Sequence, residues 1–217
     1  MYEEDLPDYF LARDAYLRAI GTVETNLLAP IINPGLVGGP VWPALRESWR
    51  CVRHGRNTIL VSDGLSDPFD DNVEENVGLG VDVLVETAEE VGEPLAATWL
   101  FDLVYGVSQQ AASSGAFREL RDDLGLFSSE IHAPVSLRRL ASPEGHVGVL
   151  LGVPAPELIV EWELPAGLVR LVPATLLHPS ELLHIREEGV AGRDRVSELL
   201  LASGSGHLSL INRSPVL

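Results

Sequence analysis

The chain has 217 residues, enough for one large domain or two small ones. All 15 basic residues are arginines, which excludes chemistry that needs a lysine, such as Schiff-base catalysis or a Walker A phosphate loop. The net charge of −17 argues against nucleic acid and anionic membranes as partners. Hydrophobic residues make up 46% of the chain, which predicts a folded core rather than disorder.

The N-terminus and the cysteine content predict a cytoplasmic protein. The first five residues, Met1 to Asp5, are acidic where a secretory signal would be basic and then apolar. Cys51 is the only cysteine, which leaves no intramolecular disulfide and no Cys-rich zinc site. A single cysteine is typical of a reducing compartment.

A helix is predicted at 8–20, where apolar residues recur on neighbouring turns and Gly21 can end it. After it, the uncharged stretch from Leu27 to Leu45 is about as long as a membrane-spanning helix. It contains four prolines and three glycines, which prevent a continuous helix. We favour an irregular loop packed on the chain's own core, and the alternative is an apolar arm that docks on a partner.

The middle of the chain predicts a hairpin, a strand and two helices. The hairpin pairs strands at 48–54 and 57–63 across a short glycine-containing link. Residues 78–87 alternate with period two and predict a strand with one polar face. A buried helix follows at 94–110, beginning at Pro94, and a shorter amphipathic helix at 116–124.

The last third predicts more strands and then two helices. Apolar or alternating runs predict strands at 134–141, 146–153, 157–164 and 168–176. Further elements are a helix opened by His178-Pro179 and closed by Gly189, a helix at about 193–202, and a short strand at 208–211. This order is not strict βαβ alternation, so we predict an α/β (α+β) fold with a mixed, largely antiparallel sheet and helices packed on it.

No sequence motif identifies an enzyme. Gly64-Leu65-Ser66-Asp67-Pro68 begins like a nucleophile elbow but lacks its closing glycine. No histidine falls in an H-E-x-x-H pattern. We therefore predict no catalytic residue, no metal ligand and no cofactor.

The strongest local signal is acidic. Between Arg56 and Arg118 there is no basic residue, but there are 12 acidic ones. The acids around one turn predict, in order of preference, a solvated loop, an acidic surface for a basic protein, or a site for a hard cation such as Ca²⁺. The candidate protein-binding residues are Asp63, Ser66, Asp67, Asp70, Asp71, Glu74 and Glu75.

The pattern resembles the suppressor of fused (SUFU) domain family. The resemblance rests on the strand and turn Thr58 to Phe69, the strand Val81 to Glu86, and the helical segment Trp99 to Val104. It is extended by Leu151-Gly152-Val153 and by Leu171-Val172-Pro173 running into Ser180-Glu181-Leu182. Together these segments extend over about residues 40 to 202, and their order is more specific than any one of them.

The resemblance implies one SUFU-like domain over 1–217, with 1–40 forming an N-terminal helix and a Pro/Gly-rich arm. It also implies a noncatalytic module that binds proteins. Animal members sequester a transcription factor through a peptide clamped between two domains, of which this chain resembles only the N-terminal one. Some bacterial relatives have been proposed as immunity proteins that neutralise toxins, and the lysine-free, Ala/Leu/Val/Gly/Arg-rich composition suits a bacterium with a GC-rich genome.

We therefore predict a cytoplasmic bacterial binding module, of which an immunity-type protein is one form, whose acidic surface meets a basic partner. The first alternative is a divalent-metal-dependent enzyme that uses the Asp63–Asp71 loop. The second is a homodimer formed through the 27–45 arm.

Overall fold

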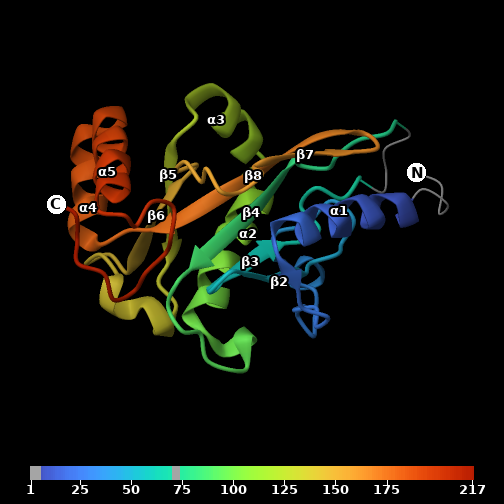
Figure 1. Ribbon diagram of the computed structural model, residues 1–217, viewed down its shortest axis with the longest axis horizontal. Coiled ribbons are helices and arrows are strands. Elements are labelled where there is room, and N and C mark those ends of the chain that lie inside the picture. The colour runs from blue at the N-terminus through green and yellow to red at the C-terminus, as the bar shows by residue number, and fades with distance from the viewer. Residues whose placement is uncertain (1–5, 70–73) are drawn as a thin grey trace.

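The computed structural model describes residues 6–69 and 74–217, and it is built around a mixed sheet (Figure 1). The strands are β1 (Thr22–Val23), β2 (Trp49–His54), β3 (Asn57–Ser62), β4 (Val81–Thr87), β5 (Phe127–His132), β6 (His146–Leu151), β7 (Glu161–Leu164) and β8 (Gly167–Leu176). Their order is β1-β2-β3-β4-β8-β6-β5, and β7 pairs with β8 outside this path.

The strand directions confirm the predicted fold class. Strands β4 and β8 are parallel, with Val83 opposite Val172, and the other neighbouring pairs are antiparallel. The predicted hairpin is present as β2 and β3, whose register places Trp49 opposite Ser62. The chain therefore has a mixed, largely antiparallel sheet.

Helices cover both faces of this sheet. The α-helices are α1 (Leu6–Ile20), α2 (Trp99–Ser114), α3 (Phe117–Leu124), α4 (Pro179–Glu188) and α5 (Val190–Ala202), and the 3-10 helices are η1 (Pro34–Val37), η2 (Leu95–Ala97) and η3 (Val135–Leu140). Figure 1 shows α1 near β2 and the β7–β8 hairpin, and α4 and α5 at the opposite end, near the C-terminus. None of the helices in the described ranges is long and apolar enough to cross a membrane.

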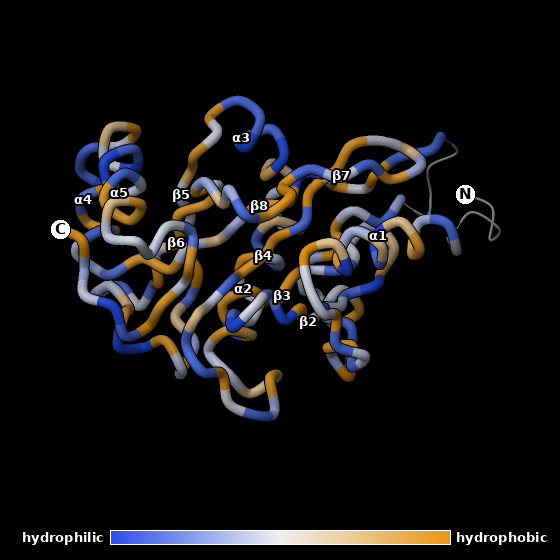
Figure 2. The backbone as a smooth tube through the Cα atoms, in the orientation of Figure 1, coloured by the Kyte–Doolittle hydropathy of each residue, from blue (hydrophilic) through white to orange (hydrophobic). Residues whose placement is uncertain are grey.

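The sheet carries hydrophobic clusters on both faces, because successive strand residues point to opposite sides, and a third cluster packs Leu150 of β6 against Ile185 of α4 and Leu200 of α5. On one face, Leu60 and Val83 belong to the cluster that includes Leu103 of α2. On the other face, Ile59 and Leu84 belong to the cluster that includes Tyr9, Tyr16 and Leu17 of α1. Figure 2 shows hydrophobic segments along β8 and its neighbours, whereas α3 is mostly hydrophilic.

The strand predicted at 134–141 is wrong. Residues 135–140 form the 3-10 helix η3, which follows Pro134 and buries Leu137 and Leu140. The edge strand beside β6 is instead β5, whose sequence Phe-Ser-Ser-Glu-Ile-His buries only Phe127 and Ile131. An edge strand with so many polar residues has a weak hydrophobic pattern, and the run at 134–141 was the stronger apolar signal.

Three other predicted elements differ from those in the structure in their burial, their bounds or their type. Strand β4 is buried on both faces, so its predicted polar face, with Asp82 and Glu86, lies inside the molecule. The helix predicted from Pro94 is divided into η2 and α2, because Thr98 caps α2 through a hydrogen bond from the Phe101 amide. Residues 208–211 form no strand, although the Ser209 amide donates to the Glu86 carbonyl.

Candidate functional site

The predicted acidic turn follows directly from β3. Gly64 has φ +152°, and a Cβ there would lie 2.1 Å from the Arg46 carbonyl oxygen, so only glycine fits this close approach. The turn then carries Asp63, Ser66 and Asp67 into the interior, where their exposed fractions are 2%, 0% and 5%.

Two arginines from distant parts of the chain meet these carboxylates. Arg13 of α1 places Nη1 2.8 Å from Asp63 Oδ1 and 2.7 Å from Asp67 Oδ1, and its Nη2 donates to Ser66 Oγ. Arg46 donates from Nε to Asp67 Oδ2 at 2.7 Å and from Nη2 to Asp63 Oδ1 at 2.8 Å. The Arg46 guanidinium also lies 4.8 Å from the centroid of the Phe10 ring, a cation–π contact.

Asp82 of β4 completes what we call the arginine–aspartate cluster: Arg13, Arg46, Asp63, Ser66, Asp67 and Asp82. Its carboxylate is fully buried and accepts hydrogen bonds from Ser62 and Ser66. Ser66 therefore bridges Asp82 and Arg13. The cluster joins four parts of the chain: α1, the segment before β2, the end of β3 and the start of β4.

The pKa values of Asp63 and Asp82 are shifted in opposite directions. Burial raises the pKa of Asp63, but the charges of Arg46, Arg13 and Arg50 outweigh burial and hold it below its ordinary value. Burial raises the pKa of Asp82 to about 7, against the lowering effects of Arg13 and the two serine hydroxyls. Asp63 is therefore a stable anion, whereas Asp82 titrates near neutrality.

The predicted binding residues fall into three groups. Asp63, Ser66 and Asp67 come together in the buried cluster and expose at most 5% of their surface. Asp70 and Asp71 lie outside the described residues. Glu74 and Glu75 are exposed and belong to no part of the cluster.

The ion pairs use the carboxylate oxygens that the alternative, a metal site at this turn, would need. Both Asp67 oxygens and Asp63 Oδ1 already accept from guanidinium groups. A cation that used these atoms would have to displace Arg13 and Arg46. Within residues 6–69 and 74–217, no three His, Cys, Asp or Glu side chains are grouped so as to hold a metal ion.

Sequence reasoning missed the arginines of this site. Arg13 lies 50 positions before Asp63, and Arg46 lies 17 positions before it, so no local motif joins them. The available signal was composition: every cation is an arginine, the side chain best suited to buried, multiply bonded ion pairs.

The segment from Leu27 to Leu45 is anchored at two points. Leu28 exchanges backbone hydrogen bonds with Trp49, and the fully buried Trp42 packs edge-to-face on Trp49 at 5.3 Å between ring centroids. At these two anchors the segment packs on the chain's own core, as predicted. The remaining large apolar side chains are exposed, and we call them the arm surface: Leu27, Ile31, Ile32, Leu36, Val37, Val41 and Leu45.

A hollow of about 490 Å³ adjoins the arm surface and the arginine–aspartate cluster. Its apolar lining comes from α1 and the start of the arm, and its charged lining includes three arginines. We call it the Arg50 hollow, and it is lined by Phe10, Leu11, Arg13, Asp14, Leu27, Arg46, Arg50 and Asp63.

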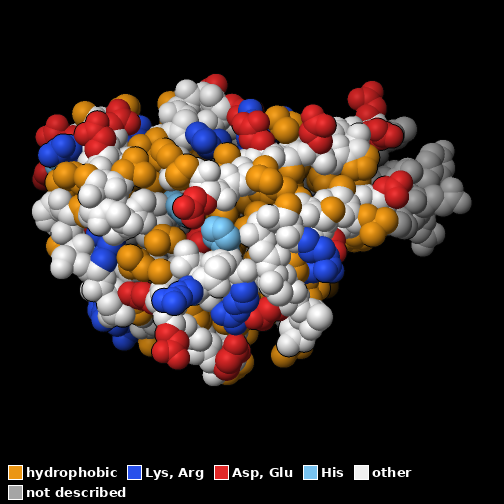
Figure 3. Space-filling model, in the orientation of Figure 1, with side chains coloured by type: hydrophobic (Ala, Val, Ile, Leu, Met, Phe, Trp, Pro, Cys, Tyr) orange, Lys and Arg blue, Asp and Glu red, His pale blue; other side chains and the backbone are white. Residues whose placement is uncertain are grey.

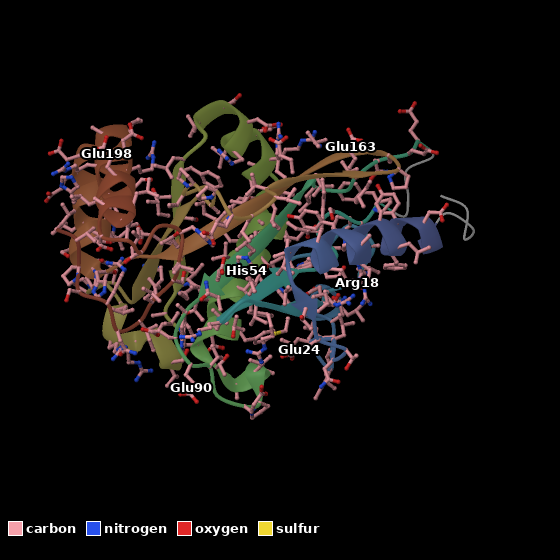
Figure 4. The ribbon with its side chains drawn as sticks, in the orientation of Figure 1. Arg18, Glu24, His54, Glu90, Glu163 and Glu198 are labelled. Atoms are coloured by element: carbon pink, nitrogen blue, oxygen red, sulfur yellow. The ribbon has the colours of Figure 1, made fainter. Side chains whose placement is uncertain are left out.

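Another buried carboxylate, Glu86 of β4, lies outside the cluster and holds the C-terminal segment. Its oxygens lie 2.9 Å from His54 Nδ1 and 2.7 Å from His207 Nε2, and Asn57 also donates to it. Burial raises the pKa of Glu86, but hydrogen bonds from His207, His54 and Asn57 outweigh it and lower the pKa. His54 lies near the centre of the molecule in Figure 4. This group is structural, because each of its members bonds within the chain.

Comparison with known proteins gives a structural match. No family model matches the sequence, and no curated protein matches it. A chain of the Sufu–Fu complex crystal structure superimposes with a TM-score of 0.56 at 16% identity, over 97% of this chain and 93% of that one. Drosophila Suppressor of Fused gives a TM-score of 0.48 at 16% identity, over 74% of this chain and 39% of that one. The chain therefore has a SUFU-like fold, as the sequence resemblance predicted.

Proposed function

We propose that this chain is a noncatalytic protein-binding module and that the arm surface is its binding face. The observation that carries the proposal is the exposure of seven large apolar side chains on one uncharged segment of a chain with net charge −17. Exposed apolar patches of this kind mark protein interaction sites. The fold supports the proposal, because one of the matched solved structures is a complex of Sufu with Fu.

The arm surface has the rigidity that a preformed binding face needs. Its two anchors, Leu28 and Trp42, fix the segment to β2. Within it, Asn33 caps η1 by accepting from the Gly35 amide at 2.8 Å and donates to the Leu45 carbonyl. A segment held this way loses little conformational entropy on binding.

Site-specific photo-crosslinking in the source cell tests this proposal. A benzoylphenylalanine at position 32, on the arm surface, is compared with one at position 183, another exposed apolar site, on α4; Ile32 is 64% and Leu183 53% exposed. We expect a discrete crosslink to another protein from position 32 and none from position 183. Equal crosslinking from both positions would contradict the proposal, and crosslinks only to a second copy would establish the homodimer alternative instead.

We propose further that the chain is a cytoplasmic bacterial protein of the immunity type that binds a basic partner. On the face seen in Figure 3, acidic side chains line the upper edge over α3 and the β7–β8 hairpin, where Figure 4 labels Glu163. Among the described members of the predicted acidic set, Glu74 and Glu75 are exposed. A basic partner on such a surface would associate faster at low salt. A complex indifferent to ionic strength, or neighbouring genes for metabolic enzymes alone, would count against it.

A thermal-shift measurement tests the alternative function, a metal-dependent enzyme. If the chain is such an enzyme, Ca²⁺, Mg²⁺ or Mn²⁺ should raise its melting temperature, and this shift should disappear in Asp67→Ala. The guanidinium groups that occupy Asp63 and Asp67 support the binding module over this alternative.

A further inference from the structure

We infer that the Arg50 hollow receives an aspartate or glutamate side chain of the protein partner, flanked in the partner's sequence by aliphatic residues that cover the arm surface. This inference rests on the proposed function and names the chemistry of the partner. It concerns the residues that line the hollow, whereas the basic partner is proposed for the acidic surface that includes Glu74 and Glu75.

Among the described residues, Arg50 makes the fewest hydrogen bonds of the three arginines that line this hollow. Its side chain is 23% exposed, and among the described residues its one hydrogen bond runs from Nη2 to Asp14 Oδ1 at 3.1 Å. Its Nη1 lies 3.7 Å from Asp63 Oδ2, beyond hydrogen-bonding distance. A guanidinium offers five N–H donors in a planar fork, which suits a carboxylate that binds through both oxygens.

The floor of the hollow favours an anion as well. Arg13 is 2% exposed, lines the hollow, and has a buried Nε without a partner in the described part of the chain. The acceptors near it are occupied, since Asp63 Oδ1 and Asp67 Oδ1 each lie within 2.9 Å of both Arg13 and Arg46. The lining also holds Asp14 and Asp63, and Asp63 Oδ2 accepts no hydrogen bond from the described residues, so an entering carboxylate must bind on the Arg50 side of the hollow, where the three arginines outnumber the two acids.

The walls of the hollow explain why the acidic residue needs aliphatic neighbours. Phe10 and Leu11 of α1 are 39% and 65% exposed at its rim. Leu27, at 50%, belongs both to the hollow and to the arm surface, so the apolar lining continues from one to the other. Apolar contact around a charge pair excludes water and strengthens it.

The charge distribution points to the same partner. Residues 13–56 contain six arginines and three acidic residues, a net charge of +3, so the rest of the chain carries −20. This region supplies most of the lining of the hollow and contains the arm surface. An acidic segment is drawn toward this region, whereas the strongly acidic rest of the chain repels it.

Display selection of random peptides on the whole chain tests the inference. Peptides that bind the wild type are counted again on Arg50→Gln, Leu11→Ser and Ile31→Asp/Ile32→Asp, with Arg56→Gln as the matched control at an exposed arginine outside the hollow. We expect enrichment of Asp or Glu beside Leu, Ile or Val. Affinity should fall at least about tenfold in Arg50→Gln and recover partly in Arg50→Lys, while Arg56→Gln binds as the wild type does.

The outcomes separate this inference from the proposed function. Peptides that depend on Ile31 and Ile32 but not on Arg50, or that are basic, would overturn the inference and keep the arm as a binding face. Selection that yields no peptide dependent on either site would overturn both. Matching thermal melts of Arg50→Gln and Arg50→Lys guard against loss of folding as the cause.

Discussion

Arg13 and Asp63 are 50 positions apart in the sequence, yet Nη1 of one lies 2.8 Å from Oδ1 of the other and both side chains are buried. Their contact joins α1 to the end of β3. It also changes the meaning of the acidic turn, because acids that the sequence suggested for a surface act here as counterions inside the fold.

Removing the buried counterion should destabilise the protein strongly. Asp63→Ala leaves Arg13 and Arg46 with one fewer anion in the interior. We expect a loss of about 3–5 kcal/mol in the free energy of unfolding, the usual cost of leaving a buried charge unpaired. Urea denaturation measures it. Glu74→Ala, at an exposed acid, should stay within about 0.5 kcal/mol of the wild type, and equal effects of the two variants would refute the ion-pair account.

Asp82 should make stability depend on pH. Its pKa in the folded protein is about 7, above the ordinary aspartate value, so the fold favours the protonated carboxyl. This contribution is fully present below about pH 4 and is lost as pH rises through about 7. Relative to Asp82→Asn, the wild type should therefore lose stability between these values in urea melts. A difference that does not change with pH would contradict the assignment.

Substitutions in the Leu27–Leu45 segment should reduce folding stability at its buried anchors but not at its exposed residues. Trp42 is fully buried against Trp49, so Trp42→Ala should cost about 3–5 kcal/mol of folding stability. Ile31 is fully exposed, so Ile31→Ser should change stability by less than about 0.5 kcal/mol. Thermal or chemical denaturation of the two variants checks this, and a large loss in Ile31→Ser would show that the arm packs on the chain's own core.

His207 should control the order of the C-terminal segment. It bonds to the buried Glu86 carboxylate, next to the Ser209 amide that donates to the Glu86 carbonyl. We expect His207→Ala to speed hydrogen exchange at Ser209 and at Asn212, whose amide donates to Glu89. His132→Ala, at an exposed histidine, is the control, and unchanged exchange in His207→Ala would contradict this role.

The sequence predicts those parts of the fold that depend on local pattern. The β2–β3 hairpin, β8 and the helix ending before Gly189 follow from alternation, turn residues and caps. Strand β5 could not be predicted, because it is held by pairing with β6 rather than by an apolar run of its own.

The candidate site shows the same limit. Spacing located Asp63, Ser66 and Asp67, but their burial depends on Arg13 and Arg46, which only the tertiary fold brings to them. The arm was recognised as uncharged and unable to form a continuous helix, whereas its exposure depends on where Leu28 and Trp42 anchor it.

The most direct test of the account is an affinity measurement with the protein that crosslinks to position 32. Calorimetric titration of that purified protein with the wild type, with Ile31→Asp/Ile32→Asp, and with Leu183→Asp compares the arm surface with an exposed apolar site on α4. The account predicts that the arm variant binds at least about tenfold more weakly and that Leu183→Asp binds as the wild type does. Equal affinity for all three proteins would show that the arm surface is not the binding face.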